Sequence, residues 1–162
     1  MNEDWERRVA DAWASIDEYG ETEFRALIEG LAAELPPGDG TADFERACAF
    51  DSTGDPARAV TLYRQATAAG LTGERRRRAA IQLASSLRNL GRPEESVALL
   101  TAERDAGSDH LDDALRAVLA LALTDLGRER EAVSIAITAL AAHLPRYRRS
   151  MAEYARLLVE PE

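Results

Sequence analysis

The chain has 162 residues, of which 46% are hydrophobic and 6% aromatic, and its formal net charge is −9. This length and apolar content suffice for one domain with a core, while the negative charge argues against nucleic acid or an anionic membrane as a partner of the whole surface. A single cysteine excludes an intramolecular disulfide, and without a signal peptide at the N-terminus or an apolar run of membrane-spanning length we expect a cytoplasmic protein.

Apolar residues recur with helical spacing in nine segments, which are separated by short Gly, Pro and Asp breaks. The first segment places Trp5, Val9 and Ala12 on one face, and the second ends before Pro36 and Pro37. No segment alternates with period two over a useful length, so the sequence predicts an all-α fold. The nine predicted helices cover residues 3–18, 22–34, 41–53, 56–69, 73–90, 93–106, 110–126, 129–143 and 146–159.

Three glycines mark an internal repeat. Gly54, Gly91 and Gly127 are separated by 37 and 36 residues, and a similar segment follows each of them. A period in this range is typical of a solenoid of helical hairpins. A left-handed glycine closes the turn after the first helix of each pair, and Pro56 and Pro93 stand where a second helix begins.

Small side chains recur in phase with these glycines. Seven residues before each glycine lies an alanine, and five residues after it lies Ala59, Ser96 or Ala132. A larger apolar residue stands four positions before each glycine. Small residues that face one another, with a large residue between them, predict closely nested helices. The preceding alanines are Ala47, Ala84 and Ala120, and the large residues are Phe50, Leu87 and Leu123.

In this pattern the chain resembles the tetratricopeptide repeat family over roughly residues 41–160. The resemblance implies a right-handed solenoid of stacked antiparallel helix pairs in a single domain, 1–162. Its parts would be a degenerate N-terminal hairpin (3–35), three repeats (41–70, 73–106 and 110–143) and a capping helix (146–160). The order of segments also resembles short bacterial tetratricopeptide proteins common in actinobacteria.

The resemblance further implies a protein-interaction module that holds a peptide or helix of a partner in a concave groove. Groove residues of the family lie at fixed offsets along the first helix of each pair. Transferred onto this sequence, the candidate groove residues are Asp51, Arg78, Gln82, Ser85, Arg88, Asn89, Val118, Leu121, Arg149 and Arg156. The lysine and asparagine clamp with which some members hold a terminal carboxylate is not reproduced, because the chain contains no lysine.

Nothing in the sequence predicts catalysis, a cofactor or a metal site. His110 and His143 lie 33 residues apart, with no other ligand at a recognisable spacing. Cys48 falls in the middle of a predicted helix, next to a packing alanine, and is expected to fill the core rather than act as a nucleophile. The glycines are isolated, so there is no phosphate-binding loop.

The run Arg75-Arg76-Arg77-Arg78 opposes the helix dipole at a predicted N-terminus and therefore needs compensation. It could bind an acidic peptide or another anion, or it could pair with the chain's own acidic half, since residues 1–74 hold 16 acids and 6 arginines. Arg146-Tyr147-Arg148-Arg149 has the same two interpretations.

The predicted helices 110–126 and 129–143 are apolar on almost every side. Such helices are either covered by neighbouring helices of the chain, or they form an apolar groove or a self-association surface. The alternative to a groove-binding module is therefore a structural protein that self-associates through residues 110–144.

Overall fold

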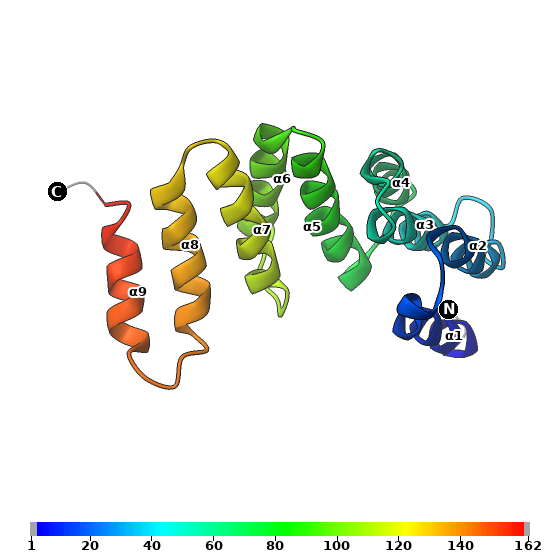
Figure 1. Cartoon of the computed structure of the whole chain (residues 1–162), viewed down its shortest axis with the longest axis horizontal. Coiled ribbons are helices and arrows are strands. Elements are labelled where there is room, and N and C mark those ends of the chain that lie inside the picture. The colour runs from blue at the N-terminus through cyan, green and yellow to red at the C-terminus, as the bar shows by residue number, and fades with distance from the viewer. Residues whose placement is uncertain (1–2, 161–162) are drawn as a thin grey trace. The chain divides into compact units, whose positions relative to one another are not determined.

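The computed structural model describes residues 3–160, and within that range the chain is all-α, without a strand (Figure 1). Helix pairs follow one another along the chain, as the repeat predicted. The helices are α1 (Glu3–Ala14), α2 (Glu21–Ala32), α3 (Gly40–Ser52), α4 (Pro56–Ala68), α5 (Gly73–Asn89), α6 (Pro93–Ala106), α7 (Asp112–Asp125), α8 (Glu129–Ala141) and α9 (Arg148–Leu157). They group into two compact units, one ending at Ser86 and the other beginning at Leu87.

The first predicted helix, 3–18, is shorter than expected. Regular α-helix ends at Ala14, and a 3₁₀ turn, η1 (Ile16–Glu18), follows. The reason is local, because the hydroxyl of Ser15 donates to the backbone carbonyls of Asp11 and Ala12 and competes with the helical ladder there. Elsewhere the predicted bounds agree within a few residues.

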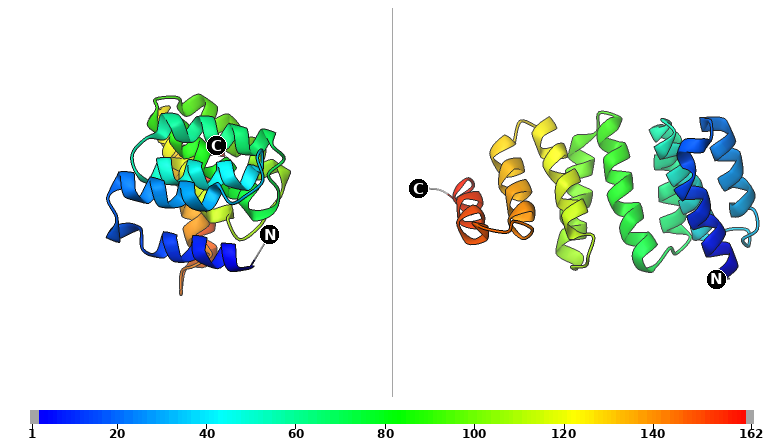
Figure 2. Two further views of the ribbon diagram at one scale, coloured as in Figure 1. Left: turned by 90° about the vertical axis from the view of Figure 1, so that its right-hand side faces the viewer. Right: turned by 60° about the horizontal axis from the view of Figure 1, so that its bottom comes forward.

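In the first unit, α1 packs on α2 and α2 on α3. The indole of Trp5 is buried and donates to the carbonyl of Leu31 over 2.8 Å, which fastens the opening hairpin. Helices α3 and α4 lie side by side in both figures and enclose the second core of this unit (Figures 1 and 2). Ala47 and Ala59, the predicted small residues, are 0% exposed in that core and pack around Tyr63.

In the second unit, α6 packs on α7, α7 on α8 and α8 on α9. Each of the two strongly apolar helices therefore has a neighbour on two sides, which accounts for most of their apolar surface. Leu115, Leu119 and Leu123 of α7 are buried. Coverage is incomplete, because Leu121 of α7 and Leu140 of α8 each remain 51% exposed.

The repeat glycines end their helices as predicted. Gly54, Gly91 and Gly127 have φ angles of 83°, 73° and 69°, in the left-handed region that favours glycine. After each of them the next N–H reaches back to the carbonyl of the predicted large residue; from Arg92 to Leu87, for instance, the distance is 3.0 Å. This is the Schellman arrangement, and it uses carbonyls that the helix end leaves without partners.

Candidate functional site

The first unit contains four of the predicted groove residues, and internal hydrogen bonds already hold two of them. Asp51 is half-buried and accepts from the hydroxyl of Ser86 over 2.8 Å, and burial raises the pKa of its carboxyl. Gln82 accepts from the thiol of Cys48 over 3.5 Å. Ser85 is half-buried on α5. The fourth residue, Arg78, has a different environment.

Arg75 and Arg78 occupy one face of α5, a single turn apart, but their partners differ. Arg75 forms ion pairs with Glu6 over 2.6 Å and with Glu45 over 3.1 Å, so it pairs with the chain's own acidic half. Arg78 places its guanidinium over the ring of Phe44, 5.2 Å from the centroid. Among the residues that the structure describes, no carboxylate lies within ion-pair distance of Arg78.

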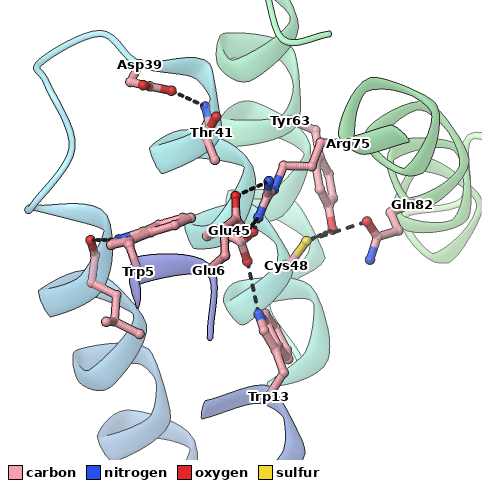
Figure 3. A network of polar contacts seen from close by, with 11 residues as sticks. Trp5, Glu6, Trp13, Asp39, Thr41, Glu45, Cys48, Tyr63, Arg75 and Gln82 are labelled. Atoms are coloured by element: carbon pink, nitrogen blue, oxygen red, sulfur yellow. Dashed lines mark hydrogen bonds and ion pairs between the residues drawn. The ribbon is translucent and has the colours of Figure 1, made fainter. Parts of the chain in front are cut away.

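The network around Glu45 explains why Arg75 is fixed (Figure 3). Glu45 is only 3% exposed, and besides Arg75 it accepts from the indole of Trp13 over 3.0 Å. The hydrogen bonds that Arg75 donates to Glu6 lower the pKa of the Glu6 carboxyl and raise the pKa of the Arg75 guanidinium. A buried carboxylate such as that of Glu45 needs a hydrogen-bonded cation beside it, so Arg75 stabilises the folded chain.

A cavity of about 670 Å³ opens beside these two arginines in the first unit. Arg78, Arg75 and Thr41 line it, together with three acids: Glu6, which pairs with Arg75, Asp39 and Glu74. Asp39 caps α3 by accepting from the N–H of Thr41 over 2.8 Å. The cavity is therefore polar, and Arg78 is the arginine in its lining that pairs with no acid among residues 3–160.

The second unit contains the other six predicted groove residues. Arg88 forms an ion pair with Asp125 over 2.6 Å, and Arg156 pairs with Glu153 and Glu160. These two arginines are thus already engaged. The remaining four differ in exposure: Val118 is half-buried, whereas Asn89, Leu121 and Arg149 are exposed. A continuous groove across all ten predicted residues stays a prediction.

The candidate nucleophile and the histidines behave as ordinary structural residues. Cys48 is 2% exposed, and burial raises the pKa of its thiol to about 12, so almost no thiolate forms near neutral pH. His143 is exposed and lies 2.7 Å from Asp113, whose pKa it lowers. His110 is exposed as well. Over residues 3–160 no group of three or more His, Cys, Asp or Glu side chains could hold a metal ion.

Sequence reasoning missed three residues of this site. The Asp39 cap had a local signal, since an aspartate between Pro-Pro-Gly and a helix is a common start. Glu6 and Glu45 had none, because acids are abundant throughout the first half and nothing in their spacing indicates which one is buried. Only the packing of α1 and α5 against α3 identifies Glu45 as the partner of Arg75 and Trp13.

No helix among the described residues is both long enough and apolar enough to cross a membrane. A search of curated proteins found none that matches the chain.

Solved structures do match it. A crystal structure of a candidate kinesin light chain of Podosopora anserina with nearly identical TPR-like repeats is 21% identical, with a TM-score of 0.71 over 95% of this chain and 82% of that one. A point variant of that same protein is 20% identical, with a TM-score of 0.72 over 98% and 85%. At this identity the likeness concerns the fold. The family model described as tetratrico peptide repeat matches residues 40–158, and the chain therefore belongs to the tetratricopeptide repeat family.

Proposed function

We propose that this chain is a protein-interaction module that binds an acidic peptide or helix of a partner through the first helices of its repeats. The observation that supports this most directly is Arg78. Its guanidinium lies over Phe44 at the edge of a polar cavity and has no carboxylate partner among the described residues. A carboxylate from a bound peptide would supply one.

Three acids, Glu6, Asp39 and Glu74, line the cavity beside Arg78, and none of them forms an ion pair with it. Glu6 pairs with Arg75, which Glu45 shares, and Asp39 caps α3. The ring of Phe44 holds the guanidinium in place by a cation–π contact, so less side-chain freedom is lost when an acid binds. Arginine also presents two parallel N–H groups, which suit a carboxylate.

Peptide selection tests the proposal. A phage-displayed library of random peptides is selected on the wild-type chain, and the enriched peptides are titrated by fluorescence anisotropy. A charge-assisted hydrogen bond contributes roughly 1.5–3 kcal/mol, so Arg78→Glu is expected to weaken binding about tenfold or more. The melting temperature should fall only slightly, because Arg78 forms no ion pair with the described residues and loses only its cation–π contact with Phe44.

Arg104→Glu is the matched control. Arg104 is an exposed arginine of α6 that pairs only with its neighbour Asp105, and its reversal should leave binding unchanged. Selection of no peptide, or of peptides that bind Arg78→Glu as tightly as the wild type, would refute the proposal.

Self-association is a second candidate, and exposed apolar residues of the second unit favour it. Leu121 on α7 and Val133 and Leu140 on α8 are between 48% and 51% exposed. Burial of these side chains in a homodimer would be favourable. Light scattering at micromolar concentration distinguishes the two candidates, since a monomer that still binds selected peptides leaves only the first.

A further inference from the structure

Helix α9 has apolar residues on two sides, and only one of these sides is covered within the described chain. On the covered side, Ala155 is 0% exposed, and its carbonyl accepts from the buried hydroxyl of Ser134 on α8 over 2.7 Å. On the open side, Tyr147, Tyr154 and Leu157 follow one another at helical spacing and are 74%, 61% and 51% exposed. Large side chains gathered in this way usually mark a binding surface.

A cavity of about 630 Å³ lies beside this stripe, between the end of α8 and the start of α9. Its lining includes the apolar side chains of Leu140, Leu144 and Met151 and the ring of Tyr154. It is large enough for an apolar side chain of a partner, and such a side chain in a pocket is the usual anchor of a helix that docks on another helix.

The rim of this surface is basic. A second depression, of about 610 Å³, shares Tyr147 and Tyr154 with the first and is lined by Arg146, Arg148 and Arg149 and by one acid, Glu153, which pairs with Arg156. Residues 146–160 carry four arginines and two glutamates, a net of +2 in a chain of net −9. Arg146 and Arg149 have no carboxylate partner in the part of the chain that the structure describes.

Tyr147 stands between the two depressions in a strained conformation. Its φ of 67° makes it the one non-glycine residue with positive φ among residues 3–160. Aromatic residues seldom adopt this conformation, and such strain clusters at binding sites and active sites. It directs the chain into α9 while the phenol ring stays exposed.

We infer that the open side of α9 binds an acidic amphipathic helix of a partner protein. An apolar residue of that helix would enter the cavity beside Leu140 and Met151, and its carboxylates would pair with Arg146 and Arg149. This rests on the proposed role as an interaction module, but it concerns a surface other than the cavity of Arg78.

Charge decides between this occupant and a second copy of the chain. In a two-fold symmetric pair each α9 would face the other, so the same patch meets itself. The three rim arginines of each copy, Arg146, Arg148 and Arg149, would then meet those of the other, and like charges across an interface oppose association. An acidic amphipathic helix fits both features of the surface, because its apolar face would cover the apolar stripe and its carboxylates would pair with the basic rim.

The test uses a phage-displayed library of 18-residue helical peptides with a fixed apolar stripe and randomised positions elsewhere. Selection on the wild-type chain should enrich Glu and Asp over Lys and Arg at the randomised positions. Binding of the enriched peptides should weaken about tenfold or more in the double variant Arg146→Glu, Arg149→Glu, and also in Tyr154→Ser. All three side chains are exposed, so folding, followed by circular dichroism, should be retained.

Two further variants separate this proposal from the previous one. Arg78→Glu should bind these helical peptides as tightly as the wild type does. Arg128→Glu reverses an arginine of the second unit outside the proposed surface, and it should also leave the affinity unchanged. Peptides sensitive to Arg78 but not to Arg146 and Arg149 would overturn the present inference and leave the proposed function intact. Failure to enrich acidic sequences would also overturn it. Two other results would overturn the inference. One is that single-stranded poly(U) RNA binds the chain more tightly than the selected peptides do. The other is that light scattering shows a dimer that Tyr154→Ser dissociates.

Discussion

Glu45 on α3, which is buried, and Arg75 on α5, which is half-buried, form an ion pair with 3.1 Å between the carboxylate Oε1 and the guanidinium Nε. The same carboxylate accepts from Trp13, and the same guanidinium reaches Glu6, so three helices meet at one charge cluster (Figure 3). One of the four consecutive arginines is thereby a structural residue of the first unit.

Removal of Arg75 should therefore destabilise the first unit strongly. Loss of one partner of a buried pair leaves an uncompensated charge, which costs about 3–5 kcal/mol. Arg75→Met should lower the free energy of unfolding by an amount near the lower end of that range, because Trp13 still donates to Glu45. Urea denaturation followed by tryptophan fluorescence measures it. Adding Glu45→Gln to Arg75→Met should recover part of the loss; a double variant no more stable than Arg75→Met would contradict this account.

Acid should weaken the same cluster. The hydrogen bonds from Arg75 lower the pKa of Glu6 below its ordinary value of 4.5 in the folded chain. The stabilisation is complete above the unfolded pKa and is lost as the pH falls through the folded pKa. The urea midpoint should thus fall as the pH drops from about 5 toward 3.

The control for this pH dependence is Glu6→Gln, which should remove only the part of the acid loss that comes from Glu6, because the pKa values of Glu29 and Glu34 are lowered as well. Asp51 acts in the opposite direction, because burial raises its pKa, so only the difference between wild type and variant reports on Glu6. If the urea midpoint fell equally steeply with pH in wild type and Glu6→Gln, the Glu6–Arg75 pair would contribute nothing to stability.

The glycines of the repeat should respond differently from a glycine inside a helix. Gly127 has a φ of 69°, so Gly127→Ala is expected to cost about 1 kcal/mol. Gly30 lies within α2, and a Cβ there would meet nothing within 4 Å, so Gly30→Ala should stabilise by about 0.5–1 kcal/mol. Thermal unfolding measures both, and equal effects of the same sign would contradict the assigned turn.

Cys48 should be unreactive until the chain unfolds. With a pKa of about 12, the thiolate fraction at pH 8 is on the order of 10⁻⁴, and the sulfur is almost inaccessible. A disulfide reagent such as DTNB should label the native protein at least about a hundredfold more slowly than the protein in urea. Rapid labelling of the native chain would place the thiol at the surface.

The repeat could be predicted from the sequence because its signals are local. A left-handed turn requires glycine, as at Gly91, and close helices require small residues, as at Ala84, which is 0% exposed. The partners of charged residues could not be predicted, because they depend on which helices meet. Arg88 was assigned to the groove, yet it pairs with Asp125; Arg78, on the same helix, has no such partner among the described residues.

The helices of the repeat can pack closely because the side chains between them are small, and one substitution tests this directly. Ala47 is 0% exposed between α3 and α4 and packs in the core with Tyr63, so a leucine there has no room. Ala47→Leu should destabilise the first unit by about 1–3 kcal/mol, through displaced side chains or a backbone shift.

Ala117→Leu on α7 is the control, because Ala117 is exposed and leucine is nearly as good a helix former as alanine. Calorimetry should then show a lower melting temperature for Ala47→Leu and little change for Ala117→Leu. If Ala47→Leu were as stable as the wild type, the in-phase alanines would not be what holds the hairpins together, and the repeat would owe its stability to its larger side chains alone.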